Sequence, residues 1–448
     1  MSICLYEYLC LDIVGSEDYV RLIRLINASN DSLDSQKFIS RITSGSFGEG
    51  LELEGSDLDI MIVPHLLEVT DQTKKQDYYY PKNYFLSDTD DVKPGFAYLR
   101  LMKGNTIKKN LLYRGVDGQL FLSSVLLKQQ FLNKGLPVVH GPCVSDETGR
   151  FDIAICPHSK SWITTASKWV TRSNKSWPTD EVKLRVINHG VLFVPIGTGG
   201  NLNEELKWRI SFSVGEKFLI YSFNHTQLLC YALMKILLKD IISKSPGCKD
   251  LLCSYFIKTI LFWISEEIPI LVWTPDNLIP CFMRCFKRLM YCVEQSMCPH
   301  YFIPENNLFE NKIIEQGRIR LLKTLCLIPK SCLIPDELKL YAHNVSGALP
   351  VPPVVYLHFL KYLCHYHLDN VRNYQESLGD LHLTIEENYF ISERFMKAGA
   401  YDCLGIAFLV VGDRDSARAA FGKSKELNPD QTENWSYKRL AMMDKRDN

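Results

Sequence analysis

Apolar and polar residues follow different patterns in successive parts of this chain. Between residues 43 and 195, short apolar runs are bounded by turn residues, which is typical of β-strands. Four runs show this pattern most clearly: LDIMIV (58–63), FAYLRL (96–101), RFDIAIC (150–156) and GVLFVPIG (190–197). Apolar positions at helical spacing predict helices over residues 1–42 and over LFLSSVLLKQQFLNKGL (120–136).

After residue 200 the strand signals fade, and helical periodicity continues to about residue 330. The helical segments are SVGEKFLIYSFN (213–224), QLLCYALMKILLKDIISK (227–244) and CSYFIKTILFWISEE (253–267). PHYFIPENNLFE (299–310) shows neither pattern and is predicted to be an irregular connector. We therefore expect a mixed α/β lobe over residues 1–195 and an all-helical lobe over residues 196–335.

The last hundred residues form a third part, residues 350–448, after a proline-rich linker at 346–353. The stretch 401–429 matches a tetratricopeptide (TPR) unit at Tyr401, Leu404, Gly405, Phe408, Ala417, Phe421 and Pro429. One repeat cannot bury its own apolar face, so helices over 354–375 and 384–398 are expected to stack on it. Two uses stay open: a helical cap on the second lobe, or a groove that binds a partner protein.

Composition narrows the class of protein. The chain has 448 residues, 46% of them apolar and 23% charged, which suits a globular protein of several domains. Because the formal net charge is zero, any nucleic-acid contact needs a local basic patch. No stretch reaches the roughly 18 apolar residues of a membrane span, and the N-terminus is typical of a packed helix rather than a signal peptide. Fifteen cysteines without a C-x-x-C pair favour the reduced thiols of a cytoplasmic protein.

The stretch TSGSFGEGLELEGSDLDIMIV (43–63) contains the strongest chemical signal. Asp57 and Asp59 lie two positions apart at the start of a strand, so their side chains point to the same face. Two such carboxylates repel each other unless a cation lies between them, and Mg²⁺ or Mn²⁺ prefers oxygen ligands of this kind. The preceding turn, 44–48, offers backbone N–H groups and a hydroxyl to a phosphate. Nucleotidyl transfer needs both features side by side.

A third carboxylate is expected from elsewhere, and Asp152 is the candidate because it lies alone in an apolar strand. An aspartate buried there is costly unless it is paired or binds a ligand. The alternative is that Asp57 and Asp59 are merely solvated acids, as most D-x-D pairs are. Rival acids in or just after the turn are predicted to be solvated: Glu49, Glu52 and Glu54.

Six motifs, in this order, resemble the Mab-21 family, which includes cyclic GMP–AMP synthase and the animal cGAS-like receptors. They are GSFGEGLELEGSDLDIMIV, FDIAICPHSKSW, LKWRISFSVGEKFL, ALMKILLKDI, SYFIKT and YFIPENNLFE, within roughly residues 20–330. The resemblance implies a mixed-sheet nucleotidyltransferase lobe of the DNA polymerase beta type and a helical lobe. It also implies ligand-activated synthesis of a cyclic dinucleotide from ATP, GTP or other NTPs in innate immune nucleic-acid sensing.

The resemblance further implies roles for individual residues. The family's metal ligands fall on Asp57, Asp59 and Asp152, and its donor-phosphate turn falls on Gly45 and Ser46. Its other nucleotide-binding positions fall on Lys235 and Ser254 for phosphate, Tyr255 for stacking on a base, and Arg209, Ser211, Ser213 and Glu216 at the acceptor base. Structural alternatives exist for several of these: a snorkelling lysine at Lys235, a core residue at Tyr255, an exposed helical acid at Glu216.

The chain departs from cyclic GMP–AMP synthase at the zinc insertion of that enzyme. The insertion lies between the motifs that match SFSVGE and ALMK, and only KFLIYSFNHTQLLCY separates them here. A structural zinc site takes four ligands, so we predict no structural zinc. The activating ligand therefore stays open between double-stranded RNA, DNA and another molecule.

Basic residues between 158 and 189 predict a nucleic-acid surface that contacts phosphates with little sequence preference. Its named contacts are Lys160, Lys168, Arg172 and Lys175, with Arg21 and Arg24 of the N-terminal helix beside them. The alternative is a solvated surface of mixed charge. Two rival functions also stay open: a non-catalytic Mab-21-type nucleotide-binding or scaffold protein, and a nucleotidyltransferase that extends RNA ends.

Overall fold

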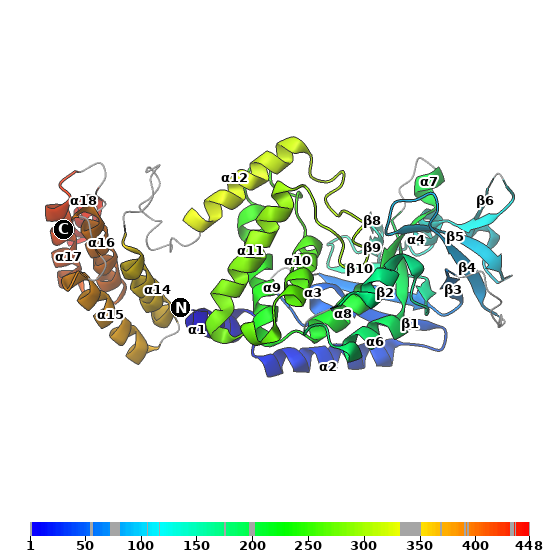
Figure 1. Ribbon diagram of the computed structural model, residues 1–448, viewed down its shortest axis with the longest axis horizontal. Helices are drawn as coiled ribbons and strands as arrows, with labels where there is room; N and C mark the ends of the chain where they lie inside the picture. The colour runs from blue at the N-terminus through cyan, green and yellow to red at the C-terminus, as the bar shows by residue number, and fades with distance from the viewer. Residues whose placement is uncertain are drawn as a thin grey trace. The chain divides into compact units, whose positions relative to one another are not determined.

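The structure, a computed structural model, describes residues 2–447 apart from 54–56, 72–80, 105, 116, 174–175, 197–201, 332–350, 368–369, 389–390, 392–393, 431–433 and 435. The chain forms two compact units (Figure 1). Residues Leu9–Ile319 make the larger unit, while Met1–Tyr8 and Arg320–Asn448 together make the smaller one. The division of residues 1–335 into two lobes at residue 195 stays a prediction.

A five-stranded mixed sheet in the larger unit positions the acidic residues. Its strand order is β1-β2-β10-β9-β8. The bounds are β1 Ile39–Ser44, β2 Leu58–Pro64, β8 Val138–His140, β9 Cys143–Ser145 and β10 Phe151–Ile155. β2 and β10 are parallel neighbours, and their register places Asp152 opposite Asp59. Strand pairing therefore brings together two aspartates that are far apart in the sequence.

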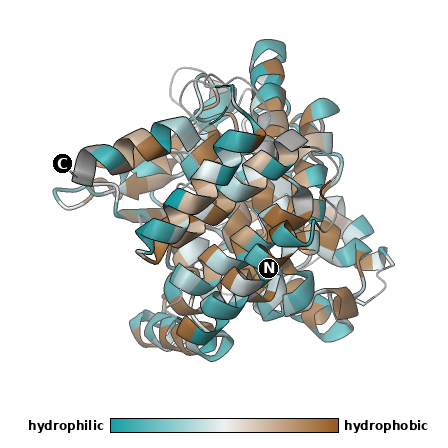
Figure 2. Cartoon of the chain, turned by 90° about the vertical axis from the view of Figure 1, so that its left-hand side faces the viewer, coloured by the Kyte–Doolittle hydropathy of each residue, from teal (hydrophilic) through white to brown (hydrophobic). Residues whose placement is uncertain are grey.

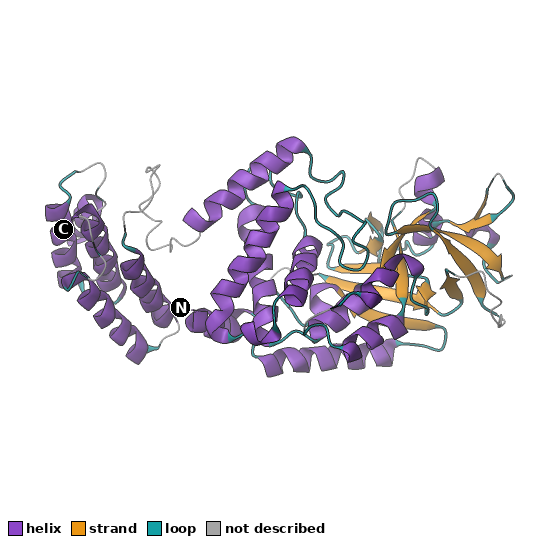
Figure 3. Cartoon of the chain, in the orientation of Figure 1, coloured by secondary structure: helices purple, strands orange, loops and turns teal. Residues whose placement is uncertain are grey.

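A second sheet of eight strands packs beside the first (Figure 3). Its order is β13-β12-β11-β3-β4-β5-β7-β6, and β13 also pairs with β5, which closes the strands from β13 to β5 into a ring. The bounds are β3 Leu67–Thr70, β4 Asn83–Asp88, β5 Phe96–Lys103, β6 Leu112–Arg114, β7 Leu120–Leu122, β11 His158–Ser159, β12 Val191–Pro195 and β13 Lys207–Ser211. Val63, Ala154 and Val194 share one buried cluster, so apolar side chains join the two sheets.

Helices complete the larger unit. They are α2 Glu17–Asp34, α3 Gly45–Gly48, α4 Ser124–Gln129, α5 Ser167–Thr171, α6 Asp180–His189, α7 Leu202–Glu205, α8 Ser213–Tyr221, α9 His225–Leu237, α10 Ser254–Glu267, α11 Leu278–Glu294 and the start of α12 Glu315–Ser331. α2 holds the glycine-rich turn by donating hydrogen bonds to its backbone. Arg24 Nε donates to Glu49 O and Asn27 Nδ2 to Phe47 O, each at 2.9 Å.

The smaller unit is helical throughout its described residues. Its helices are α1 Ser2–Tyr8, α14 Pro353–His367, α15 Val371–Glu386, α16 Arg394–Val410, α17 Arg414–Leu427 and α18 Ser436–Asp447. Phe359, Tyr362, Leu404 and Phe421 belong to its buried core, and apolar and polar residues lie in bands along the helices (Figure 2). α1 packs against α14, so the two ends of the chain share one unit.

In the described part of the chain, no helix combines the length and the hydrophobicity needed to cross a membrane.

Many of the predicted elements are confirmed. The four apolar runs form β2, β5, β10 and β12, and the three helical segments between 213 and 267 form α8, α9 and α10. The connector 299–310 is irregular, as predicted.

Four helix predictions were wrong in part. The predicted helix 354–375 is divided between α14, which ends at His367, and α15, which begins at Val371 after its N-cap Asn370. In 120–136, the first residues form β7, and a helix begins only after Ser123, whose hydroxyl accepts a hydrogen bond from Leu126 N. In 1–42, Gly15 at φ +93° interrupts the helix, and β1 occupies the end of the segment. The predicted helix 384–398 spans the end of α15 and the start of α16, because Asn388 adopts a left-handed conformation at φ 55°.

The close packing of α16 on α17 gives a testable prediction. A Cβ at Gly405 would lie 2.4 Å from Cε1 of the buried Phe421, whereas a Cβ at Gly422 would meet nothing within 4 Å. Gly405→Ala should lower the local unfolding free energy by about 1–3 kcal/mol because the ring must shift. Gly422→Ala, the matched control, should raise it by up to about 1 kcal/mol through helix propensity. Hydrogen exchange of α16 and α17 peptides measures both, and equal effects would contradict the packing.

Candidate active site

Three aspartates converge at one edge of the five-stranded sheet. Asp57 directly precedes β2, Asp59 lies in β2 and Asp152 lies in β10. One carboxylate oxygen of each lies within 4.8 Å of the others. In the described residues, no other group of histidine, cysteine or acidic side chains brings three ligand atoms together in this way. Asp57 is exposed, Asp59 is half-buried and Asp152 is buried, so the cluster reaches from solvent into the fold.

The electrostatics of the cluster fit a divalent cation. The pKa of Asp59 is raised to about 6, first by burial and then by the negative charges of Asp57 and Asp152, while Lys258 opposes the shift. A cation between the three carboxylates would relieve this repulsion. Oxygen-only ligands are the set that Mg²⁺ or Mn²⁺ prefers over softer metals, so the residues present suit such an ion.

Hydrogen bonds orient the buried member of the cluster. The Ser145 hydroxyl donates to Asp152 Oδ1, and His140 Nδ1 lies 3.1 Å from Asp152 Oδ2. Ser145 is buried in β9, whereas the side chain of His140 is 72% exposed. Asp152 is therefore held in place by its neighbours in the sheet.

The glycine-rich turn passes directly over the acidic cluster. Gly45 has φ +63°, and a Cβ there would lie 1.8 Å from Asp59 Oδ2, so only glycine fits. The next hydroxyl, that of Ser46, accepts a hydrogen bond from the Lys235 ammonium. Burial lowers the pKa of Lys235, and the carboxylates of the site, Asp57 and Asp59 among them, oppose that shift. The structure thus brings a cation and a hydroxyl close to the acids.

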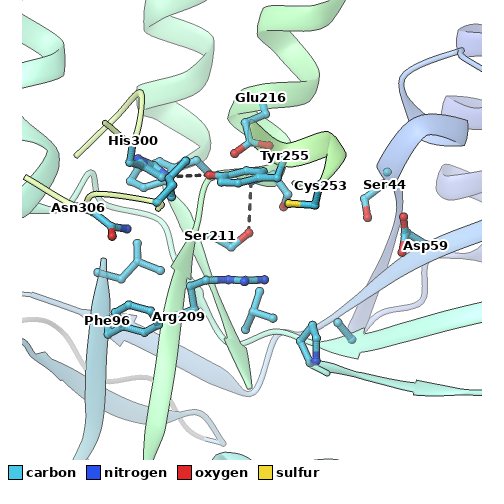
Figure 4. Close-up of a pocket in the computed structure, with 18 of the residues that line it drawn as sticks. Ser44, Asp59, Phe96, Arg209, Ser211, Glu216, Cys253, Tyr255, His300 and Asn306 are labelled. Atoms are coloured by element: carbon cyan, nitrogen blue, oxygen red, sulfur yellow. Dashed lines mark hydrogen bonds between the residues drawn. The ribbon is translucent and has the colours of Figure 1, made fainter. Parts of the chain in front are cut away.

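A cavity of about 510 Å³ opens beside the cluster (Figure 4). Eight of the predicted site residues line it: Gly45, Asp59, Asp152, Arg209, Ser211, Ser213, Glu216 and Tyr255. Four others do not: Asp57, Ser46, Lys235 and Ser254. Of these, Asp57 belongs to the acidic cluster, Ser46 and Lys235 contact each other, and Ser254 is exposed at the start of α10. Eight of the twelve predicted catalytic and nucleotide-binding residues therefore line one cavity.

The aromatic wall of the cavity is held by a buried histidine. His300 Nδ1 accepts hydrogen bonds from Phe302 N and Ile303 N at 3.1 Å, so the ring proton lies on Nε2. Nε2 lies 2.7 Å from the Tyr255 hydroxyl (Figure 4). Burial lowers the pKa of His300 to about 3, with Arg209 contributing, and the ring is neutral at neutral pH. Tyr255 is thereby held against His300, while burial and then the nearby Glu216 carboxylate raise the pKa of its hydroxyl.

Sequence reasoning missed several lining residues. Lys93, Phe96, His300, Asn306 and Lys312 all line the cavity. The motif YFIPENNLFE contains Asn306 and directly follows His300, but no site residue is predicted in this connector. Its backbone irregularity and its polar residues were the available signal.

The expectation that Glu49 is solvated was wrong. Only 4% of its side chain is exposed, and its carboxylate pairs with the Lys258 ammonium at 2.5 Å. The partner lies on a helix far away in the sequence, which is why the turn alone did not indicate the pairing.

The basic residues predicted to bind nucleic acid have different surroundings. Lys160 is exposed, and Lys168 is exposed but pairs with Glu305. Arg172 is used inside the fold, since its guanidinium donates to both oxygens of Glu266 at 2.7 and 2.9 Å. Lys175 lies outside the described residues.

The two arginines of α2 that were expected at the nucleic-acid surface also interact within the protein. Arg24 is half-buried and bonded to the turn, and Arg21 pairs with Glu17 at 2.6 Å. Large apolar side chains are instead exposed on α2, namely Tyr19, Leu22, Leu25, Ile26 and Leu33. This face of α2 is not a basic platform.

Comparisons with known proteins agree with this geometry. The family of the Mab-21 protein HhH/H2TH-like domain matches residues 227–325. Cyclic GMP–AMP synthase of Mus musculus is 23% identical over 314 residues, which cover 65% of this chain and 61% of that protein. Protein mab-21-like 3 of Danio rerio is 31% identical over 108 residues, or 23% of this chain and 27% of that protein. A cyclic GMP–AMP synthase-like receptor of Magallana gigas is 26% identical over 117 residues, or 25% of this chain and 20% of that protein.

The mixed sheet with its acidic cluster and the adjoining helices define the class, a fold of the nucleotidyltransferase superfamily. Within that class, residues 227–325 match the Mab-21 domain family, and the chain is similar to proteins named cyclic GMP–AMP synthase and cyclic GMP–AMP synthase-like receptor. The chain spans 61% of the mouse relative and 20% to 27% of the other two named relatives.

The repulsion among the aspartates predicts how the site responds to substitution. Asp59 has a raised pKa, so its ionisation destabilises the fold as pH rises from about 4 to about 6, and the penalty persists at pH 7. Asp59→Asn should therefore raise the unfolding free energy in EDTA at pH 7 by about 1–2 kcal/mol. Mn²⁺ should stabilise the native chain and stabilise the variant less. Thermal unfolding with and without Mn²⁺ measures both effects.

Asp240→Asn is the matched control, because this aspartate belongs to a largely exposed pair with Lys244. It should change the unfolding free energy by no more than about 0.5 kcal/mol under either condition. A loss of stability on Asp59→Asn in EDTA would show that the aspartates do not repel one another as described.

The contact between Gly45 and Asp59 predicts a second effect. Gly45→Ala would push the Asp59 carboxylate aside, and Mn²⁺ affinity should fall at least about tenfold, near 1.4 kcal/mol. Gly118→Ala is the matched control, since Gly118 also has positive φ, +82°, but a Cβ there meets nothing within 4 Å. Isothermal titration with Mn²⁺ compares the two, and an equal loss in both would point to backbone strain alone.

Proposed function

We propose that this protein is a ligand-activated nucleotidyltransferase that makes a cyclic dinucleotide second messenger from nucleoside triphosphates. The observation that carries the proposal is the convergence of Asp57, Asp59 and Asp152 beside a cavity of about 510 Å³. The names of two relatives, a cyclic GMP–AMP synthase and a cyclic GMP–AMP synthase-like receptor, support it.

In the proposed reaction, a ribose hydroxyl of one nucleotide attacks the α-phosphate of another and pyrophosphate leaves. A second transfer of the same kind closes the ring. Mg²⁺ or Mn²⁺ held by the three aspartates would neutralise the charge that develops on the phosphate oxygens. ATP and GTP are the substrates that the family resemblance favours, with other NTPs as alternatives.

The residues of the chain divide between donor and acceptor nucleotides. On the donor side, Gly45, Ser46 and Lys235 lie at the turn over the acids, where N–H groups, a hydroxyl and a cation suit phosphates. Ser254, exposed at the start of α10, is proposed as a further phosphate contact. On the acceptor side, Arg209, Ser211, Ser213 and Glu216 offer hydrogen bonds to a base, and Tyr255 offers a ring for stacking.

The activating ligand is proposed to be double-stranded RNA or DNA. Lys160 and Lys168 remain as phosphate contacts among the described residues, and salt-dependent binding is expected. Arg172 is left out because Glu266 binds its guanidinium. The cytoplasm is the proposed location, in keeping with nucleic-acid sensing.

The smaller unit is proposed to be a TPR-like module that binds a partner protein. α16 and α17 contain the positions that matched the repeat, and Gly405 allows their close approach through Phe421. Tyr362 reaches across to α16, where its hydroxyl donates to Ala407 O at 2.9 Å, so a preceding helix stacks on this pair.

The alternative is a non-catalytic Mab-21-type nucleotide-binding or scaffold protein, and one experiment separates it from an enzyme. Purified protein is incubated with labelled NTPs, Mg²⁺ or Mn²⁺, and a panel of double-stranded RNA and DNA. We expect small, phosphatase-resistant products with one of the nucleic acids. Long products would indicate an enzyme that extends RNA ends, and no product under any condition would support the scaffold.

The Asp57→Ala/Asp59→Ala double variant tests the site in the same assay. It should abolish product formation, because two of the three ligands of the proposed ion are lost. Asp88→Ala/Asp90→Ala is the matched control, since these two aspartates form another D-x-D pair at the end of β4. Full activity is expected from this control. Activity that survives in the Asp57/Asp59 variant would show that the reaction takes place elsewhere.

A further inference from the structure

A buried lysine joins two carboxylates that come from different elements of the larger unit. Lys258 Nζ, on α10, lies 2.5 Å from Glu49 Oε1 and 3.2 Å from Glu216 Oε2. The exposed fractions of the side chains are 12% for Lys258, 4% for Glu49 and 7% for Glu216. The ammonium therefore balances only one of the two carboxylates, and a net negative charge lies largely out of contact with water.

The two carboxylates belong to opposite sides of the candidate site. Glu49 is the residue that ends α3, and its backbone N–H donates to Gly45 O at 3.1 Å, so it is part of the turn over the acids. Glu216 lies on α8 and lines the cavity on the side proposed for the acceptor base. Lys258 itself does not line the cavity.

Each carboxylate lies near a tyrosine, and the second oxygen of Glu49 is buried without a hydrogen-bond partner among the described residues. Burial and the nearby Glu49 carboxylate raise the pKa of Tyr231, and burial and the nearby Glu216 carboxylate raise that of Tyr255, whose hydroxyl lies 2.7 Å from His300 Nε2. Tyr231 lies on α9, the helix that also carries Lys235. The two ion pairs of Lys258 thus connect the turn with α8 and α10, and Tyr255, which follows Ser254 on α10, meets His300 of the aromatic wall.

The fold alone does not account for three buried charges at this place. Removing two carboxylates and an ammonium from water is costly, and apolar residues of similar volume often serve stability as well or better. A charged bridge differs from an apolar contact because it fixes the distance and direction between its members. Here those members are the turn on one side and the cavity wall on the other.

We propose that Lys258 is a positioning residue that sets the donor-phosphate turn in register with the acceptor wall by holding Glu49 and Glu216 together. This proposal rests on the proposed function. Lys258 acts through the two glutamates and contacts neither nucleotide. Without it, two buried carboxylates would face each other unpaired, and the turn would move away from the wall.

The test uses Lys258→Met in the full chain, with binding of a fluorescent, non-hydrolysable ATP analogue in Mg²⁺ as its first measurement. We expect the affinity for the analogue to fall at least tenfold. We also expect a melting temperature lower by several degrees. Lys258→Arg, which keeps the charge, should recover most of the affinity. Lys244→Met is the matched control, because Lys244 forms an exposed pair with Asp240, and neither quantity should change.

A double variant separates positioning from stability. Glu49→Gln/Lys258→Met removes one of the two carboxylates together with the lysine, so the melting temperature should recover in part, with Glu216 still unpaired, while the affinity stays low. Recovery of both would overturn the proposal, since the lysine would then only stabilise the fold. An unchanged affinity in Lys258→Met would overturn it as well.

Failure of this proposal is distinguishable from failure of the proposed function. If the native chain binds the analogue but forms no product, the function proposal fails while the binding comparison still tests Lys258. Where product is formed, Lys258→Met should raise KM for the donor nucleotide more than it lowers kcat, and an effect on kcat alone would contradict a role in positioning the donor turn.

Discussion

The mutual repulsion of three carboxylates is the constraint on which the rest of the larger unit depends. Parallel pairing of β2 with β10 places Asp152 opposite Asp59, and Asp57 lies two residues before Asp59 in the same cluster. Such a cluster would relax by moving apart if its surroundings allowed it. Instead Ser145 and His140 hold Asp152, and the backbone at 45 leaves no space beside Asp59. The sheet therefore keeps like charges together, which is useful only where a counter-charge is to be bound.

Local patterns revealed the parts of this site that are encoded in short stretches. Asp57 and Asp59 were recognisable from their spacing, and Asp152 from its isolation in an apolar strand. Glu49 was misread, because its partner Lys258 is more than two hundred positions away and nothing in the turn indicates it. The short strands β8 and β9 went unnoticed for a related reason, since their pairing partners supply most of what makes them strands. Ion pairs and strand pairings between distant segments determine such features, and the local periodicity of the sequence carries no signal of them.

Charge counting overstated the basic surface for a physical reason. Cations in a folded protein are used internally wherever a buried carbonyl or carboxylate needs a donor. Arg24 contacts the turn, and Arg172 is bound by Glu266 while stacking on Trp263. Both residues count toward the predicted basic surface, yet their guanidinium groups serve the architecture. A platform for polyanions can be inferred only from cations that the fold leaves at the surface.

The packing of α1 against α14 affects how the chain could be divided into fragments. The polypeptide leaves the smaller unit after Tyr8, builds the larger one and returns at Arg320, so two covalent connections join them. A protease that severs one connection leaves the other intact, and the pieces stay tethered. A fragment that ends before Arg320 separates α1 from α14, and a fragment that starts there lacks its first helix. Expressing the smaller unit alone therefore calls for a circularly permuted or co-expressed design, whereas the larger unit is the continuous segment Leu9–Ile319.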